Sequence, residues 1–138
     1  MSRVLRAARS TDAGKVGDIL SDFIDTTAWM ARIHTRAQDI HHAGVMIAQG
    51  WVQVAEVDGR VIAFLAREAA DVHALYVAKD MRGHRHGRAL LQAAQEATDH
   101  LWLWTFQLND GAQRFYSAHG FKEAERTNGA GNDEGLPD

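Results

Sequence analysis

A short basic segment near the middle of the chain carries the residues best suited to chemistry. It runs Arg82-Gly-His-Arg-His-Gly-Arg88, between a β-rich run that ends at Val77 and a helical pattern over 88–100. Free backbone N–H groups at a helix N-terminus, with the positive end of the helix dipole, bind anions. Glycine lets a phosphate approach the backbone, and arginine adds charge-assisted donors. The segment therefore predicts a diphosphate-binding loop, with an ordinary solvated helix cap as the alternative.

Every residue of this segment is a candidate cofactor contact. The seven are Arg82, Gly83, His84, Arg85, His86, Gly87 and Arg88. The segment has neither the Gly-Lys-Ser/Thr ending of a Walker loop nor the Gly-x-Gly-x-x-Gly pattern of dinucleotide-binding folds.

The segment and its surroundings resemble the GNAT N-acetyltransferase superfamily. Ala74–Val77 followed by Arg82–Leu91 is similar to its acetyl-CoA-binding motif, Arg/Gln-x-x-Gly-x-Gly/Ala. Asn109–Phe121 is similar to its Asn-x-x-Ala-x-x-Phe-Tyr-x-x-x-Gly-Phe segment, and the helix start at Ser10–Asp12 to its N-terminal portion. The resemblance covers residues 3–125 and implies an enzyme with acetyl-CoA as cosubstrate and no metal. It would move the acetyl group to a primary amine of a small-molecule or peptide acceptor. A non-catalytic acyl-CoA-binding or regulatory domain is the alternative.

The resemblance also implies roles for individual residues. Tyr116 would be the general acid that protonates the departing CoA thiolate, with a half-buried packing residue as the alternative. A phenol, with a pKa near 10, is still protonated at neutral pH. Leu75 and Val77 would offer backbone groups to the pantetheine arm. Asn109 would bond the same arm through its amide, or else cap the next helix.

A general base is harder to assign. Asp71 and His73 are expected on the strand face of Leu75, and an acidic residue near Asp71 serves as base in one branch of the family. Histidine has the better suited ordinary pKa, near 6.5. A pair of surface residues, with an ordered water as base, is the alternative.

Two departures from the family pattern stand out. Arg85 occupies a position where the family places glycine. Its side chain could hinder the approach of the diphosphate to the backbone, or strain the turn by about 1–2 kcal/mol if the turn is left-handed. Alternatively, its guanidinium could bind the phosphates directly. The family also closes its sheet with a seventh strand, and nothing strand-like follows Arg126. We expect a homodimer to cover the edge formed by 121–126 if that strand is absent.

The elements around these residues predict an α/β fold of the α+β type in the order βααβββαβαβ, with a mixed, mainly antiparallel sheet between helices. Strands are expected over 3–8, 51–57, 60–66, 71–77, 101–108 and 121–126, and helices over 10–24, 40–47, 88–100 and 112–119. Asp58-Gly59 is typical of a two-residue hairpin turn. Residues 1–126 should form a single domain, and the acidic tail 127–138 should be mobile.

Composition excludes several classes of protein. The 138 residues are 46% hydrophobic and 24% charged, as in an ordinary globular domain. A net charge of −3 argues against nucleic acid as a partner. There is no cysteine, so disulfides and thiol nucleophiles are excluded. No apolar run suits a membrane span or a signal peptide, so we expect no membrane partner and a cytoplasmic protein.

Other residues receive simpler interpretations. The histidines, including the pair His41-His42, lack a chelating spacing, which predicts no metal site. The tryptophans (Trp29, Trp51, Trp102 and Trp104) are expected in the core, Trp29 also near the acceptor pocket that the resemblance implies. Three acids in the first helical region, Asp22, Asp25 and Asp39, could attract a cationic amine.

Overall fold

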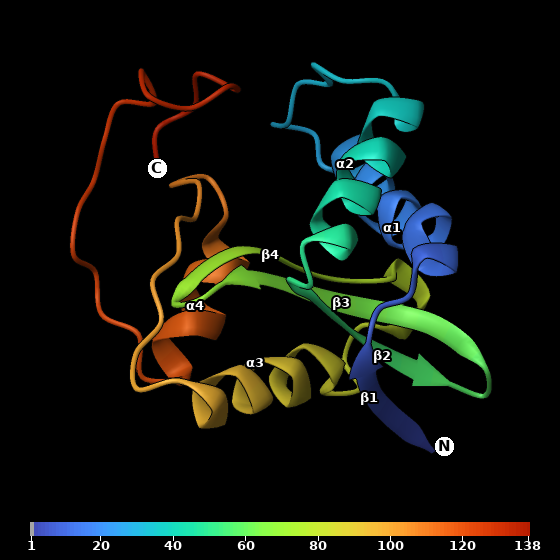
Figure 1. Cartoon of the computed structure of the whole chain (residues 1–138). Helices are drawn as coiled ribbons and strands as arrows, with labels where there is room; N and C mark the ends of the chain where they lie inside the picture. The colour runs from blue at the N-terminus through green and yellow to red at the C-terminus, as the bar shows by residue number, and fades with distance from the viewer. Residues whose placement is uncertain (1) are drawn as a thin grey trace.

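The computed structural model describes residues 2–138 and has one antiparallel sheet with helices on both faces (Figure 1). The four strands lie in the order β1-β2-β3-β4. They are β1 Arg3–Ala7, β2 Val52–Val57, β3 Arg60–Glu68 and β4 Asp71–Val77. The helices are α1 Ala13–Thr26, α2 Arg36–Ala48, α3 His86–Ala97 and α4 Asp110–Ala118, with short 3-10 turns η1 Ser10–Asp12 and η2 Lys79–Met81. The α/β class and the antiparallel meander are confirmed.

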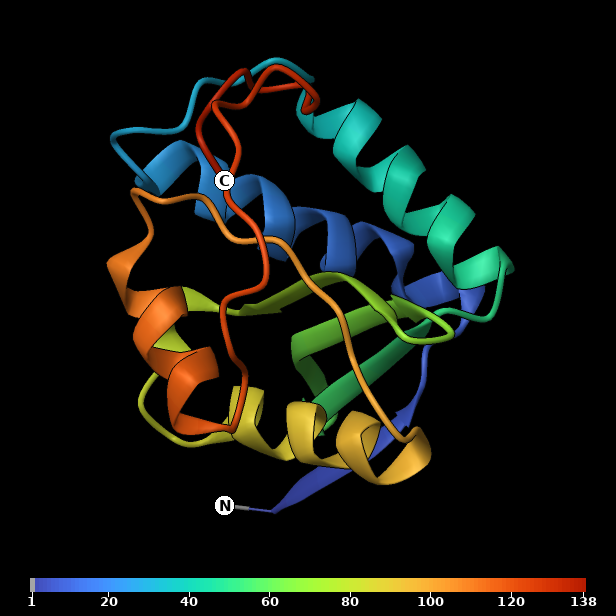
Figure 2. The same cartoon turned by 90° about the vertical axis from the view of Figure 1, so that its left-hand side faces the viewer.

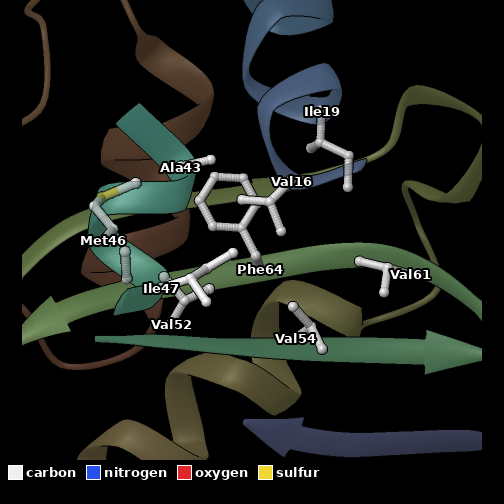
Figure 3. Close-up of a cluster of buried hydrophobic side chains, with 10 residues drawn as sticks. Val16, Ile19, Ala43, Met46, Ile47, Val52, Val54, Val61 and Phe64 are labelled. Atoms are coloured by element: carbon white, nitrogen blue, oxygen red, sulfur yellow. The ribbon is translucent and has the colours of Figure 1, made fainter. Parts of the chain in front are cut away.

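Two apolar clusters hold the helices to the two faces of the sheet. On one face, Phe64 of β3 is fully buried and reaches toward Val16 of α1 and Ala43 of α2 (Figure 3). On the other face, Leu90 and Leu91 of α3 pack beneath β2–β4. Residues of α4 lie at the margin of this second cluster. β3 is buried on both faces because a helical layer covers each of them, and Figure 2 shows the sheet edge-on between these layers.

The two-residue turn predicted at Asp58-Gly59 joins β2 to β3. Asp58 and Gly59 have φ values of 52° and 78°, the left-handed conformation that a tight hairpin between twisted strands requires. Gly120 ends α4 at φ 89°, and the N–H of Phe121 donates to the carbonyl of Tyr116 at 3.0 Å.

Two predicted strands are absent from residues 2–138. Residues 101–108 form only an isolated parallel bridge between Asp71 and Trp102, and 121–126 form no strand. A strand needs a hydrogen-bonded neighbour, and neither segment has one along its length. In the described residues, α4 is therefore the only regular element after α3. The segments 101–108 and 121–126 are chain without regular structure.

The tail 127–138 has no regular structure but contacts the body. The side-chain amide of Gln107 donates to the carbonyls of Thr127 and Asp138 at 3.2 and 3.1 Å, and its backbone N–H donates to Pro137 at 2.9 Å. The mobility of this tail stays a prediction.

Candidate active site

The predicted diphosphate loop lies between the end of β4 and the start of α3, where six successive peptide N–H groups have no partner. Within residues 2–138, no N–H from Gly83 to Arg88 donates a hydrogen bond; the first in α3 to do so is that of Ala89, to the carbonyl of Arg85 at 3.1 Å. An unfilled row of N–H groups at a helix N-terminus carries partial positive charge. The loop is therefore built to receive an anion.

Three guanidinium groups surround this row. Arg82, Arg85 and Arg88 are exposed, and none forms an ion pair with a carboxylate in the described part of the chain. Arg82 Nε donates to the carbonyl of Val77 at 3.4 Å, which ties the loop back to β4. The loop thus adds unneutralised positive charge to the helix dipole.

Arg85 adopts the left-handed conformation, one of the possibilities that the sequence left open. Its φ and ψ are 65° and 22°, and it is the residue directly before α3. A residue with a Cβ pays about 1–2 kcal/mol for this conformation, which glycine avoids. The chain retains arginine here, and the exposed side chain is free to meet an anion.

The two histidines of the loop differ in their surroundings. His84 is exposed, whereas His86 is only 2% exposed and its Nδ1 lies 3.2 Å from a guanidinium nitrogen of Arg3 on β1. Burial, then the charges of Arg3 and His84, lower the pKa of His86, so its ring is held neutral. The ring is closed to solvent, and its Nε2 has no hydrogen-bond partner among residues 2–138.

Gly87 faces Val77 and Phe115 across the start of α3. A Cβ built there would lie 3.5 Å from Val77 Cγ2 and 3.8 Å from Phe115 Cζ, which is ordinary contact. Packing within the protein therefore does not demand glycine at this position. Close approach of a ligand to the backbone is the remaining reason.

A β-bulge at His73 determines which backbone groups in the second half of β4 point away from β3. Ala66 pairs with Ala74 but Arg67 pairs with Val72, so His73 is the extra residue. Beyond the bulge, Ala78 donates to Ile62 of β3, and alternation along an antiparallel strand turns the peptide groups of Leu75 and Val77 away from β3. The contact from Arg82 to the Val77 carbonyl agrees with this direction. The backbone of Leu75 and Val77 thus faces the open side, as predicted for pantetheine contacts.

The open side is a cleft between β4 and the segment that follows α3. Val72 donates to the carbonyl of Trp102 at 2.8 Å, and Trp102 donates to Ala70 at 2.8 Å, after which the two chains separate. A cavity of about 90 Å³ lies where they diverge. Its lining includes Leu75 and Tyr76 of β4, Phe106, Asn109 and Tyr116.

Tyr116 projects from α4 into this cleft. Its ring packs at 5.2 Å from Phe115 and 5.3 Å from Phe121, and its residue lines both the small cavity and a larger neighbouring one. Burial, and to a lesser degree Tyr76, raise the pKa of Tyr116 well above its ordinary range. The hydroxyl therefore stays protonated at neutral pH.

The expected placement of Asp71 and His73 on the face of Leu75 is wrong, because the bulge changes the alternation. The ring of His73 stacks on Trp51 at 5.1 Å, on the α1–α2 side, whereas Leu75 packs with the α3 cluster. His73 Nε2 lies 3.3 Å from Glu68 Oε1. His73 lines both cavities with Tyr116, and exposed Asp71 lines only the larger one.

Asn109 acts as a helix cap. Its Oδ1 accepts from the N–H of Ala112 at 3.0 Å at the start of α4. Among residues 2–138 no acceptor takes a hydrogen bond from its amide nitrogen, and Asn109 is one of the residues that line the small cavity. Both interpretations of Asn109 are compatible with this geometry.

The acids expected to attract an amine all form ion pairs within the protein. Asp22 and Asp25 pair with Arg36 at 2.8 and 3.1 Å, while Asp39 pairs with Arg32 at 3.1 Å. Arg32 also bonds Asp25 and so joins α1, α2 and the loop between them. Their role is therefore to fasten the two helices together, which the sequence pattern did not reveal.

The tryptophans divide into two pairs. Trp29 and Trp51 are half-buried, and Trp29 packs edge-on against Phe23 and Phe106 beside the small cavity. Trp102 and Trp104 are each 57% exposed, so their predicted place in the core is wrong. They alternate with Leu101 and Leu103, which do reach the α3 cluster, because the extended segment has an uncovered face.

Two further features concern the described residues 2–138. No group of three or more acidic or histidine side chains there is arranged to hold a metal ion. None of the helices found in that range has the length and apolar character needed to cross a membrane.

Comparison with known proteins agrees with this geometry. Residues 48–123 match the family model described as acetyltransferase (GNAT) domain. The peptidyl-lysine N-acetyltransferase YiaC of Escherichia coli is 37% identical over 75 residues, 54% of this chain and 50% of that protein. A second curated relative, the uncharacterized N-acetyltransferase MJ1207 of Methanocaldococcus jannaschii, is 34% identical over 92 residues, 41% of its length. The chain therefore spans about half the length or less of the curated relatives it matches.

Solved structures share the fold. The solution structure of YjaB from Escherichia coli has a TM-score of 0.81 at 21% identity and covers 99% of this chain and 94% of that one. The aminoglycoside N-acetyltransferase AAC(6')-Iy in complex with CoA has a TM-score of 0.72 at 15% identity, with 91% of each chain covered. The family match spans more than half of the chain, and the chain therefore belongs to the GNAT acetyltransferase family.

Proposed function

We propose that the protein transfers an acetyl group from acetyl-CoA to a primary amine. The observation that carries this proposal is that β4 has the unpaired N–H row of Gly83–Arg88 beyond its C-terminal end and, along its open edge, a cavity lined by Tyr116. A helix start suited to an anion, an open strand edge and the half-buried phenol of Tyr116 would suit the diphosphate, the pantetheine arm and the thioester of acetyl-CoA in turn.

The loop would hold the diphosphate. Six N–H groups, aided by the exposed guanidinium groups of Arg82, Arg85 and Arg88, offer more donors than one phosphate needs. The outward peptide groups of Leu75 and Val77 would pair with the amide-rich pantetheine arm like an added strand. An N–H near Val77 would polarise the thioester carbonyl.

The chemistry then concerns one new bond and two protons. The neutral amine nitrogen bonds to the thioester carbon, the carbon–sulfur bond breaks, and the sulfur leaves with the electron pair. Tyr116 donates its hydroxyl proton to that thiolate. The amine loses a proton to a base, for which His73 is placed better than Asp71 because it lines both cavities with Tyr116. A water held at that point would perform the same step.

The acceptor class follows from relatives more than from the pocket. YiaC is named for peptidyl-lysine, and AAC(6')-Iy for an aminoglycoside. Both acceptors are amines, which supports an amine acceptor of small-molecule or peptide type here. We also expect a cytoplasmic homodimer that uses neither nucleic acid nor a membrane as partner.

A non-catalytic acyl-CoA-binding domain is the second candidate, favoured by the left-handed Arg85 in the loop and by the exposure of Asp71 and His73. One experiment separates the two. Melting is measured with and without CoA, and CoA release from acetyl-CoA is measured across polyamines, amino acids, aminoglycosides and lysine peptides. A rise in Tm with CoA release supports the enzyme, a rise without release on any acceptor supports the binding domain, and no rise contradicts both.

A further inference from the structure

Residues 127–138 form a closed loop beside the candidate active site. The N–H of Thr127 donates to the carbonyl of Asp138 at 2.7 Å, which brings the two ends of the segment together. The side-chain amide of Gln107 donates to the carbonyls of both end residues. Gln107 directly follows Phe106, which lines the small cavity. The base of the loop is therefore fastened next to that cavity.

The interior of the loop is held by one side chain and one glycine. The Asn132 amide donates to the carbonyl of Leu136 at 2.8 Å and accepts from the N–H of Leu136 at 3.3 Å. Gly129 is buried at φ 89°, and a Cβ built there would collide with the backbone of Leu136. These contacts determine the position of the residues between them, Asp133 and Glu134.

The loop lies at the same end of the molecule as the connection between α1 and α2. Figures 1 and 2 show both at the top, the loop in red and the connection in cyan. Trp29 of that connection packs edge-on against Phe106 at 5.7 Å, and Phe23 of α1 packs against Tyr76 of β4 at 4.8 Å. Phe106, Phe23 and Tyr76 all line the small cavity. Loop and connection therefore flank the aromatic residues at this end of the cavity.

Glu134 is the loop residue whose charge acts on the cavity lining. It is half-buried, and its carboxylate has no ion pair or hydrogen bond in the part of the chain that the structure describes. Burial, and after it the charge of Glu134, raises the pKa of Tyr76 to about 12. Glu134 does not line the small cavity and has no part in the raised pKa of Tyr116. The carboxylate therefore lies outside the cavity, nearer to Tyr76 than to Tyr116.

We propose that Glu134, held in place by the closed loop, binds a second positive charge on the amine acceptor, so that the preferred acceptor is an aliphatic diamine. The nitrogen that attacks the thioester must be neutral and must lie near Tyr116. An ammonium held at Glu134 is therefore a different nitrogen of the same molecule. The charge of this carboxylate is available because Asp22, Asp25 and Asp39 pair with arginines, whereas Glu134 does not. This inference rests on the proposed acetyl transfer, whose acceptor class it names.

The first test pairs two acceptors with two variants. Cadaverine and pentylamine share one carbon chain and differ in the second amine, so the ratio of their kcat/KM values measures the effect of the second charge. We expect the wild type to prefer cadaverine. Glu134→Gln should raise KM for cadaverine about fivefold and leave pentylamine unchanged. Asp133→Asn, at the exposed neighbouring carboxylate, is the control that should change neither acceptor.

Two outcomes of this comparison overturn the proposal. One is a wild type that uses both acceptors equally well. The other is a Glu134→Gln variant that loses the same factor with pentylamine as with cadaverine, because the carboxylate would then act without regard to the second charge.

The second test displaces Glu134 without changing it. Gly129→Ala should open the loop, because a Cβ has no room against Leu136, and the preference for cadaverine should fall as in Glu134→Gln. Gly131→Ala, in the same loop with open space around it, is the matched control and should keep the preference. CoA affinity should be equal in both variants, since no residue of the loop bonds to Gly83–Arg88 in the described structure. A Gly129→Ala variant with the wild-type preference contradicts the proposal.

Calorimetry separates this proposal from the proposed acetyl transfer. Cadaverine is titrated into the wild type and into Glu134→Gln with CoA present, so that no turnover is needed. Binding that weakens about fivefold in the variant supports the role of Glu134 even if no amine is acetylated, in which case only the proposed function fails. Acetylation of amines with equal cadaverine binding by both proteins keeps the proposed function and overturns the role of Glu134. A wild type that does not bind cadaverine overturns it as well.

Discussion

The N–H of Val72 donates to the carbonyl of Trp102 at 2.8 Å, and the cleft of the candidate active site begins at this contact. Before it, β4 and the segment after α3 lie together; beyond it, they diverge and leave the peptide groups of Leu75 and Val77 uncovered. The bulge at His73, one residue later, turns those groups toward the opening. One hydrogen bond and one extra residue thus create the edge on which the proposed chemistry depends.

Removal of the Tyr116 hydroxyl should slow turnover without affecting cofactor affinity. We expect Tyr116→Phe to bind CoA like the wild type and to lower kcat about 100-fold, since general acid catalysis is typically worth 10²–10⁴. The test measures kcat as a function of pH, and CoA binding by calorimetry, for both the variant and the wild type. Burial raises the pKa of Tyr116, so its protonation should impose no fall in rate on the wild type at neutral pH. Equal rates for both proteins at every pH would make Tyr116 a packing residue.

Substitution at Gly87 should affect the ligand more than the fold. A Cβ meets only ordinary contacts in the protein, so Gly87→Ala should leave Tm within a few degrees of the wild type. It should weaken CoA binding tenfold or more, because the methyl group would crowd the approaching phosphate. Gly14→Ala, also in the first turn of a helix and with open space around it, is the control that should bind normally. Unchanged affinity in Gly87→Ala would move the diphosphate elsewhere.

Arg85 carries two separable effects, conformational strain and charge. Arg85→Gly should stabilise the fold by roughly 0.5–1 kcal/mol, the left-handed cost less the extra backbone entropy of glycine. CoA affinity should fall several-fold, because an unpaired cation is lost. Arg85→Asn, which tolerates this conformation, should lose the same affinity and show that charge is the cause. Denaturant unfolding and calorimetry at two salt concentrations measure both effects; a gain in affinity would show that the side chain obstructs the loop.

The Asp12 carboxylate should make the fold sensitive to acid. It accepts from Arg6 at 2.8 Å and from the N–H of Arg9 at 2.7 Å, and the Arg6 contact is the first cause that lowers the pKa of Asp12. The folded state therefore binds this proton less tightly than the unfolded state, so the stabilisation is full above the ordinary pKa of 3.8 and disappears as pH falls through the lowered value.

Asp12→Asn tests this. It should cost about 2 kcal/mol at pH 7, because a charged hydrogen-bond acceptor is lost. The difference from the wild type should shrink as the pH falls below 3.8 and through the lowered pKa of Asp12. Urea unfolding at pH 7 and under acid conditions measures both. A constant difference at all pH values would assign the loss to packing.

Local patterns in the sequence determined the helices, the β2–β3–β4 meander and the place of the predicted anion-binding loop. Asp58-Gly59 specified a hairpin, and the glycines and arginines of 82–88 marked an anion site before α3, because turn conformation and helix-end electrostatics act over a few residues. The motif identified Arg85 as the place where glycine is usual, whereas its left-handed backbone came from the structure.

Tertiary structure decided what depends on partners distant in the chain. The bulge at His73 changed the face of Leu75, the ion pairs of Arg32 and Arg36 occupied the acids of α1 and α2, and the segments 101–108 and 121–126 lacked the neighbours that make a strand. Each outcome is set by which groups meet across the fold. Hydrophobic periodicity records only whether a side chain is buried, whereas strand pairing and charge neutralisation require a second group whose position the local sequence does not contain.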